Sequence, residues 1–238
     1  MRRLWQVFYL TVIAVLLAVA FERRPRPVDD PATQLQTALI LQTKNYGTVK
    51  WLGKPVWQPI LDLWTLQETI FEVQPQLLIE CGTYKGGSSY FFPQLFDLME
   101  RGRVITVDLE KQHDLSHPRA TYLIGDCAAA DRTTGPVMVV LDSDHSQRQV
   151  SRELEAYHGM VTLGSYLHVQ DGVIDVLPTF AEDRPGPLRA IEAFLAEHDE
   201  FEADLERSQR FLITHHPKGW LRRKAAQALR ATHGAADG

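Results

Sequence analysis

The 238-residue sequence contains only two cysteines, and it lacks internal repeats and low-complexity stretches. Cys81 and Cys127 do not have the spacing of a metal site, so we interpret them as buried thiols in a reducing compartment, with a disulfide as the open alternative. The net charge of −5 implies no general affinity for nucleic acid. The hydrophobic fraction of 45% is sufficient for the core of one large domain with an appendage.

Two common phosphate-binding motifs are also missing. The glycine-rich turn reads Gly82-x-x-x-Gly86-Gly87, which differs from the G-x-G-x-x-G fingerprint of dinucleotide-binding proteins. The G-x-x-x-x-G-K-[ST] phosphate loop is absent as well. Glu80 comes just before this turn, where its charge would repel a pyrophosphate and attract a cationic or amine-bearing cofactor.

The N-terminal segment Leu4–Phe21 carries no charge and is about long enough to cross a bilayer as a helix. More arginines follow this segment than precede it, which favours a cytoplasmic location for the rest of the chain. We therefore predict a single-pass membrane anchor over residues 1–22. A cleaved signal peptide is the alternative, because Ala18-Val19-Ala20 resembles a cleavage site. Residues 23–43 are predicted to be a linker and a short helix.

Apolar strand-like runs alternate with helix-like segments through the rest of the chain. This alternation predicts an α/β fold whose mostly parallel sheet is covered by helices on both faces. The predicted strands are 76–80, 103–108, 120–124, 137–142, 165–170, 201–206 and 210–214, and the predicted helices are 60–73, 88–101, 146–158 and 187–198. Residues 45–59 are rich in aromatic residues and broken by glycine and proline, so we expect a lid or substrate loop there.

Acidic or amide side chains follow five of the predicted strands. They are Glu80, Asp108, Asp126, Asp142, Gln170 and Asp171. Because the carboxyl ends of parallel strands meet at one edge of an open sheet, we expect these side chains to line a ligand crevice. Any one of them alone is explained as a helix cap or a surface acid, but the series indicates a ligand rich in hydroxyl and amine groups.

The order of these residues resembles that of class I S-adenosylmethionine-dependent methyltransferases. Longer strings resemble the cephalosporin hydroxylase / rhamnosyl O-methyltransferase family: Trp51–Pro55, Ile79–Thr83 with Gly86–Ser89, Leu141–His145, Glu153–Tyr157, Gly164–Gly172 and Pro185–Pro187. The resemblance implies a Rossmann-like methyltransferase fold over residues 44–222, with the mostly parallel seven-stranded sheet of that fold. Residues 223–238 would form a basic C-terminal tail.

The resemblance also implies roles for individual residues. The expected S-adenosylmethionine site consists of Glu80, Gly82, Thr83, Gly86, Ser88, Asp108, Asp126 and Asp142. Within this site, Asp108 would hold the ribose hydroxyls and Asp126 would lie beside the adenine.

A divalent ion, often magnesium, is a further property of the family, and the resemblance would place it at Asp142, Gln170 and Asp171. Gln170 stands where the family pattern has Glu. Its carbonyl oxygen can still ligate, but the site loses one negative charge, so magnesium binding stays open. His145 follows Asp142 closely, and we expect these two residues to be catalytic, with His145 as the base that deprotonates a sugar hydroxyl. The alternative for His145 is a local hydrogen bond at a helix start.

Several other side chains have simpler expectations. His113, Asp114 and His117 resemble an oxygenase iron set only weakly. His215 and His216 are expected on the surface. Trp64 is expected in the core, with stacking on a sugar or acyl group as the alternative. Residues 218–230 are predicted to form a terminal helix, either solvated or lying on a membrane surface.

The sequence thus predicts a membrane-tethered S-adenosylmethionine-dependent O-methyltransferase that acts on a sugar hydroxyl of a glycolipid or related metabolite, in lipid or natural-product biosynthesis. The expected partners are this acceptor and the membrane, not nucleic acid. A non-catalytic binding protein with a cofactor fold, a nicotinamide or flavin oxidoreductase, and a hydroxylase are the alternatives. The acceptor, the methylated atom and the oligomeric state, including a homo-oligomer, stay open.

Overall fold

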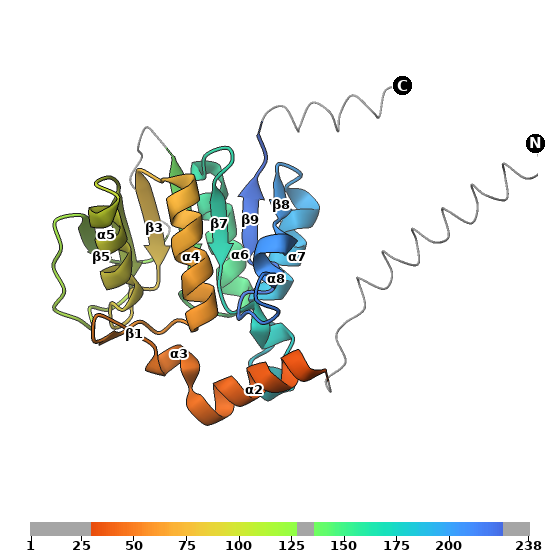
Figure 1. Ribbon diagram of the computed structural model, residues 1–238. Helices are drawn as coiled ribbons and strands as arrows, with labels where there is room; N and C mark the ends of the chain where they lie inside the picture. Colours follow the sequence, from red (N-terminus) through yellow and green to blue (C-terminus); the bar gives the residue numbers. More distant parts are fainter. Residues whose placement is uncertain (1–29, 128–135, 226–238) are drawn as a thin grey trace, which may run out of the picture.

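The computed structural model describes residues 30–127 and 136–225, which form a layered α/β unit (Figure 1). Its central sheet has seven strands in the order β5-β4-β3-β6-β7-β9-β8. Strand β9 is antiparallel to both of its neighbours, and the other strand pairs are parallel. The predicted Rossmann-like fold with a mostly parallel sheet is therefore confirmed.

The chain enters the sheet through an N-terminal region of short elements. Helix α2 spans Pro31–Thr43, α3 spans Asn45–Thr48, and the hairpin strands are β1 (Lys50–Trp51) and β2 (Lys54–Pro55). The sheet strands are β3 (Leu77–Cys81), β4 (Arg103–Asp108), β5 (Ala120–Ile124), β6 (Val137–Leu141), β7 (Tyr166–Val169), β8 (Phe201–Ala203) and β9 (Trp220–Arg223). The other α-helices are α4 (Ile60–Val73), α5 (Ser88–Leu98), α6 (Gln147–Tyr157), α7 (Pro187–Glu197) and α8 (Leu205–Gln209). Short 3₁₀ helices cover His158–Met160, Gly172–Asp175 and Pro178–Asp183.

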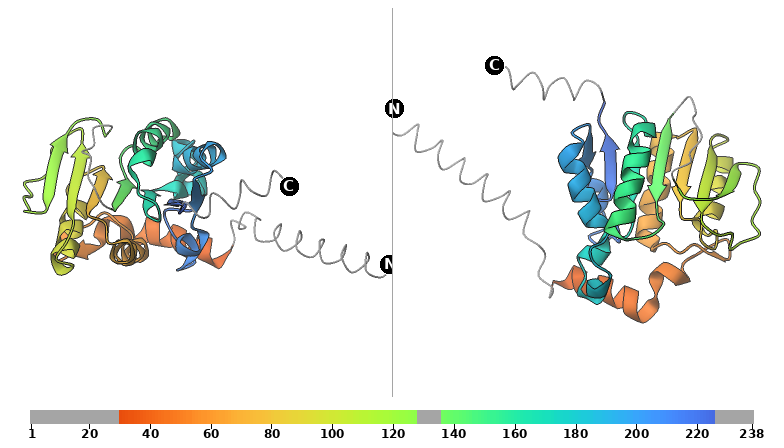
Figure 2. Two further views of the ribbon diagram at one scale, coloured as in Figure 1. Left: turned by 90° about the horizontal axis from the view of Figure 1, so that it is seen from above. Right: turned by 180° about the vertical axis from the view of Figure 1, so that it is seen from behind.

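Helices cover both faces of the sheet, with α4 and α5 on one side and α6 and α7 on the other (Figure 2). Successive strand residues point to opposite faces, so β3 supplies both layers of the core. Leu77 and Ile79 pack with the α6 and α7 residues, whereas Leu78 packs with α4 and α5. Strands β3 and β6 are buried along their whole length, as expected for central strands of a parallel sheet.

Two predictions at the C-terminal end are wrong. Residues 210–214 are not a strand, and the last strand is β9, where a helix over 218–230 was expected. Trp220 drives this outcome, because its fully buried indole stacks on His168 of β7 with ring centroids 3.8 Å apart. Pairing with β7 and β8 satisfies the β9 backbone and buries more apolar surface than an exposed helix would. Residues 226–238 lie outside the described residues.

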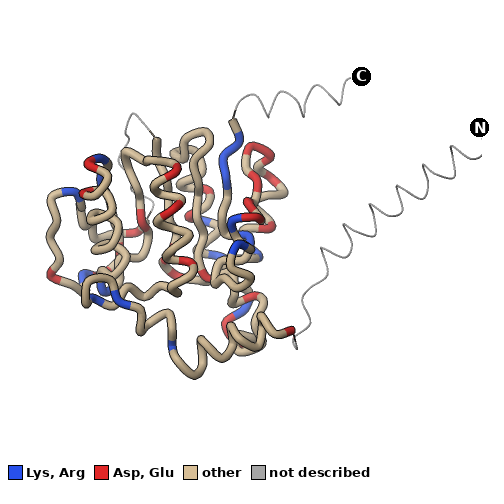
Figure 3. Tube along the Cα trace, in the orientation of Figure 1, with Lys and Arg blue, Asp and Glu red and all other residues tan. Residues whose placement is uncertain are grey.

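The prediction of a core position for Trp64 is also wrong. Its side chain is exposed, and the indole N–H donates to Glu68 at 3.0 Å. Helix α4 instead buries Leu63, Leu66 and Ile70 against the sheet. On the same side, basic residues of α8 and its C-cap pair with acidic residues of α4 (Figure 3): Arg207 with Glu72 and Arg210 with Glu68.

The predicted membrane anchor over residues 1–22 lies outside the described residues. Within 30–127 and 136–225, every helix is too short or too polar to cross a bilayer. Residues 45–59, expected to be an irregular loop, contain α3 and the β1–β2 hairpin. Both cysteines are free and buried, as the sequence analysis favoured.

Candidate active site at the carboxyl edge of the sheet

A cavity of about 760 Å³ lies at the carboxyl edge of the sheet, where the loops after β3 to β7 converge. Strand β3 sits between β4 and β6, so the chain order reverses at this point, and such switch points are where open α/β sheets bind ligands. The predicted site residues that line the cavity are Gly82, Thr83, Ser88, Asp108, Asp126, Asp142, His145, Gln170 and Asp171. Glu80 and Gly86 are the two predicted residues that do not line it.

Gly82 begins the turn that leads from β3 into the cavity. Its backbone has φ +95°, and a Cβ at this position would lie 1.9 Å from the carbonyl oxygen of Asp142. Gly87 is packed from the other side, since a Cβ there would lie 2.4 Å from the carbonyl oxygen of Pro55. Only glycine allows this turn to fit between the end of β6 and the β1–β2 hairpin.

Glu80 is fully buried behind the cavity wall. Its Oε2 accepts hydrogen bonds from the hydroxyls of Ser89 and Thr106, the latter at 2.6 Å. Burial raises the pKa of Glu80, although these hydroxyls and that of Ser88 oppose the effect. Glu80 therefore holds the start of α5 against β4, and its Oε1 has no hydrogen-bond partner among the described residues.

Two acids lie at the β4–β5 side of the cavity. Asp108 ends β4, and its Oδ2 accepts the backbone N–H of Tyr84 at 2.7 Å, which ties the glycine-rich turn to the next strand. Asp126 follows β5 and is exposed, with its Oδ2 3.0 Å from a guanidinium nitrogen of Arg152. Exposed ion pairs of this kind are weak, so a ligand can replace Arg152 at low cost.

Asp142 follows β6 and is held by two buried amides. Gln58 Nε2 donates to its Oδ2 at 3.0 Å. In this arrangement Gln58 Nε2 also donates to Gln170 Oε1 at 2.6 Å. In the alternative arrangement the Gln170 amide nitrogen faces the two carboxylate oxygens at 3.0 and 3.1 Å, and Gln58 must then turn as well, because the two amide nitrogens would otherwise lie 2.6 Å apart. Burial, together with the charges of Asp171 and Glu80, raises the pKa of Asp142 well above its ordinary value.

Asp171 lies at the centre of three histidines. Its Oδ2 is 3.2 Å from Nε2 of His145, and its Oδ1 is 3.7 Å from Nδ1 of His215. Its backbone N–H donates to Nδ1 of His216 at 2.9 Å. Burial alone would raise the pKa of Asp171, but the interactions with His145, His215 and His216 outweigh it and hold the pKa below its ordinary value. Asp171 therefore favours its ionised form, in contrast to the neighbouring Asp142.

The expectation of exposure for His215 and His216 is wrong, because both are buried and line the cavity. Asp62 of α4 accepts the backbone N–H of His215 at 2.9 Å and the hydroxyl of Thr214, which pulls this segment inward. A single His-His-Pro string has no periodicity, so the sequence carried no signal for this contact.

Aromatic side chains also line the cavity. Tyr46 and Trp57 come from the segment predicted to be a lid or substrate loop. Trp57 packs edge-on against Tyr84 with ring centroids 5.2 Å apart, and Lys85 Nζ lies 5.2 Å from each of these two rings. Phe180, from the 3₁₀ helix Pro178–Asp183, lines the cavity as well.

Two of the three residues predicted to hold a divalent ion lie together, and His145 lies beside them. Asp142, His145 and Asp171 each offer a ligand atom, all within 4.8 Å of one another. Gln170 lies beside Asp142 and adds no charge. Two carboxylates and one imidazole fit a divalent cation, although magnesium prefers a fully oxygen-based set.

Known proteins resemble this chain in sequence and in fold. The family model "Rhamnosyl O-methyltransferase/CmcI" matches residues 43–224. A rhamnosyl O-methyltransferase of Mycobacterium tuberculosis is 32% identical over 199 residues, which cover 74% of this chain and 80% of the relative. That of Mycobacterium leprae is 30% identical over 194 residues, covering 75% of this chain and 85% of the relative.

Solved structures show the same fold at lower identity. A CmcI structure with Mg and SAM has a TM-score of 0.61 at 18% identity, covering 85% of this chain and 88% of the other. A CmcI structure with SAH has a TM-score of 0.62 at 21% identity, covering 85% and 96%. The predicted methyltransferase class is thereby confirmed at the level of the family, and this chain belongs to the rhamnosyl O-methyltransferase/CmcI family.

Proposed function

We propose that this protein is an S-adenosylmethionine-dependent O-methyltransferase that acts on a sugar hydroxyl of a small molecule or glycolipid. The observation that carries the proposal is the position of His145 and Asp171. Their side chains, 3.2 Å apart, face the same cavity as the glycine-rich turn and Asp108. One cavity thus combines a candidate base with a candidate cofactor cradle.

The residues around the turn fit a nucleoside cofactor. Asp108 offers carboxylate oxygens to the ribose hydroxyls, and Asp126 lies further along the same edge. The acids of the cavity favour a cationic sulfonium over a pyrophosphate. When bound, S-adenosylmethionine supplies an electrophilic methyl group. The task of the protein is then to align this group with the acceptor oxygen, so positioning contributes most of the rate.

The tautomer of His145 follows from its neighbour. An ionised Asp171 only accepts hydrogen bonds, so the neutral His145 ring carries its proton on Nε2 and directs it to Asp171. Nδ1 is then the ring atom that can take the proton of the acceptor hydroxyl. Asp171 also stabilises the imidazolium that forms. Asp142, held by Gln58 and Gln170, shapes the adjacent wall.

A divalent ion fits beside this pair. Asp142 and Asp171 would hold it, and it would supply positive charge that lowers the pKa of a nearby hydroxyl.

The proposal includes a sugar as the methyl acceptor and attachment of the protein to a membrane. The relatives are named rhamnosyl O-methyltransferases, and the aromatic wall of Tyr46, Trp57 and Tyr84 suits stacking against a sugar ring. Membrane attachment, with the domain on the cytoplasmic side, rests on the uncharged sequence Leu4–Phe21. Fractionation of cells that express the full chain or residues 23–238 tests the attachment, since only the full chain should sediment with membranes.

Calorimetric titration of the full chain with S-adenosylmethionine and S-adenosylhomocysteine tests the cofactor. Binding of both, followed by transfer of labelled methyl to deoxysugar glycolipids, would support the proposal. Folded protein that binds neither nucleoside, with or without magnesium, would refute it. Cofactor binding without transfer to any tested sugar would refute the acceptor class.

A further inference from the structure

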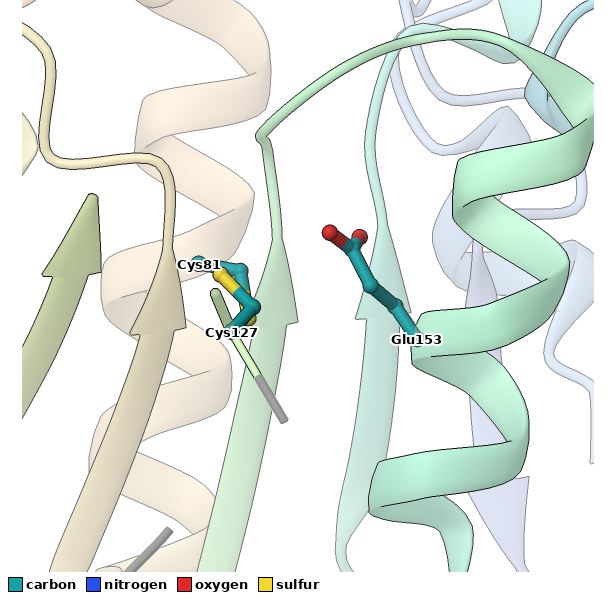
Figure 4. Close-up of side chains that lie close together, drawn as sticks. All are labelled: Cys81, Cys127 and Glu153. Carbon is teal, nitrogen blue, oxygen red and sulfur yellow. The ribbon is translucent and has the colours of Figure 1, made fainter. Parts of the chain in front are cut away.

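A second group of ligand-type side chains lies in the core beside the cavity (Figure 4). Cys81 ends β3, Cys127 follows β5, and Glu153 extends from α6 toward the two cysteines. Each residue is at most 5% exposed, and one ligand atom from each lies within 4.8 Å of the others. None of the three residues has a role in the proposed methyl transfer.

Glu153 is oriented as a metal ligand would be. Its Oε1 accepts hydrogen bonds from the Ser143 hydroxyl and from Gln149 Nε2, the latter at 2.9 Å. Its Oε2 is buried and has no hydrogen-bond partner among the described residues. An unpaired oxygen of a buried carboxyl group is costly, whereas a cation at this position would satisfy it.

The two thiols complete the group. Both cysteines are free and their thiols neighbour each other, and Cys127 Sγ also makes a long contact of 3.9 Å with the carbonyl oxygen of Val107. Burial and the neighbouring Cys127 raise the pKa of the Cys81 thiol, so this thiol favours the protonated form without a cation. The buried Tyr157 hydroxyl lies beside Cys81 and interacts with its thiol.

We propose that Cys81, Cys127 and Glu153 bind one zinc ion. Two thiolates and a carboxylate are typical zinc ligands, and three protein ligands leave a fourth position for water or another oxygen. The soft sulfur ligands select against magnesium and distinguish this site from Asp142 and Asp171. When the ion binds, two Zn–S bonds replace two S–H bonds, and two protons pass to solvent.

The ion has a route to this site. Cys127 and Glu153 both line the cavity, so an ion can reach them without unfolding of the core. Once bound, it would link β3, the residues after β5 and helix α6. Cys127 directly follows Asp126, so the zinc ion would also fix one wall of the candidate cofactor site.

Cobalt titration of the full chain, reduced and freed of metal, tests the proposal. We expect a thiolate-to-cobalt absorption band that saturates with one Co²⁺ per chain, and loss of this band when Zn²⁺ is added. Cys81→Ser and Cys127→Ser should each abolish the band. Glu153→Gln, which keeps the side-chain shape, should weaken the affinity by about tenfold or more. His198→Gln changes another possible cation-binding group, formed by Glu155, His158 and His198, and should leave the band unchanged.

Circular dichroism and a thiol count in denaturant show that each sample is folded and reduced. Absence of the band in folded wild-type protein with two reduced thiols would overturn the proposal. Persistence of the band in both cysteine variants would overturn it as well, and so would a Cys81–Cys127 disulfide that forms in the protein as purified.

Discussion

Nδ1 of His216 accepts a hydrogen bond from the backbone N–H of Asp171 at 2.9 Å. Asp171 has φ +56°, a conformation that few residues other than glycine adopt, and this bond helps to hold it there. Its carboxylate can then face His145. The bond requires an unprotonated Nδ1, and burial indeed lowers the pKa of His216. A buried neutral histidine thus fixes the residue that orients the candidate base.

His168, next to this group, should make stability depend on pH. Burial and the neighbouring His216 lower the pKa of His168 well below 6.5. As the pH falls below about 6.5, the unfolded chain takes up a proton that the folded chain does not, so folding loses stability by up to about 1.4 kcal/mol per pH unit and per group.

His168→Phe keeps a ring against Trp220 and removes this titration. Urea unfolding between pH 5 and 7 should therefore give the variant a smaller slope of unfolding free energy against pH. The raised pKa values of Glu80, Asp142 and Glu153 make the folded protein more stable as the pH falls, which opposes the effect of His168. These three residues are present in both the wild type and the variant, so their contribution cancels in the comparison. Equal slopes for the two chains would contradict the prediction.

His145→Gln should lower kcat by about 10²- to 10⁴-fold and leave the affinity for S-adenosylhomocysteine unchanged, because it removes a proton acceptor and no cofactor contact. Asp171→Asn should lower kcat as well, since an amide cannot stabilise the imidazolium. Steady-state kinetics and calorimetry measure the two effects. His117→Gln is the control: it alters a histidine that pairs with Asp97 outside the cavity lining. A His145→Gln enzyme with normal kcat would exclude the base role.

Asp108→Asn should weaken binding of S-adenosylhomocysteine by about 10- to 100-fold, since hydrogen bonds to a charged group contribute about 1.5–3 kcal/mol. The amide keeps an oxygen that can accept the Tyr84 N–H, so the turn should stay folded. Calorimetry gives the affinity, and Asp97→Asn at the surface is the matched control. An affinity within twofold of wild type would remove Asp108 from the cofactor site.

Gln170→Glu should couple the stability of the protein to magnesium. The new carboxylate would lie about 3 Å from that of Asp142, so repulsion should lower the melting temperature of the metal-free protein. Millimolar Mg²⁺ should raise the melting temperature of the variant more than that of the wild type. An equal response in thermal scans would show that Gln170 does not limit metal binding.

Gly82→Ala should be severely destabilising, by about 3 kcal/mol or more, because its Cβ would collide with the backbone of Asp142. Gly53→Ala is a control with a similar backbone, φ +85°, and open space around the Cβ position. It should cost only about 1–2 kcal/mol of strain. Chemical denaturation measures the unfolding free energy of both variants. If both lose a similar amount, the positive φ angle, and not the collision with Asp142, explains why glycine is needed at position 82.

The sequence analysis placed most of the sheet, because central strands such as β4 and β6 are continuous apolar runs that end in an acid. Because the carboxyl ends of parallel strands meet at one edge of a sheet, the sequence also predicted that Asp108, Asp142 and Asp171 would line one cavity. The prediction failed at β9, between β7 and β8, because this strand depends on the packing of Trp220 on His168, two residues that lie 52 positions apart in the sequence. His215 and His216 were misplaced for the same reason, since Asp62 draws them in from a distant helix.

The two walls of the cavity are encoded by separate stretches of the chain. The strand-end side belongs to the sheet, where every change also disturbs the core. The aromatic side comes mainly from residues 45–59 and from the 3₁₀ helix Pro178–Asp183, which lie outside the seven-stranded sheet. Selectivity for the molecule that receives the methyl group can therefore diverge during evolution, or be redesigned by segment exchange, while the chemistry of donation is inherited intact.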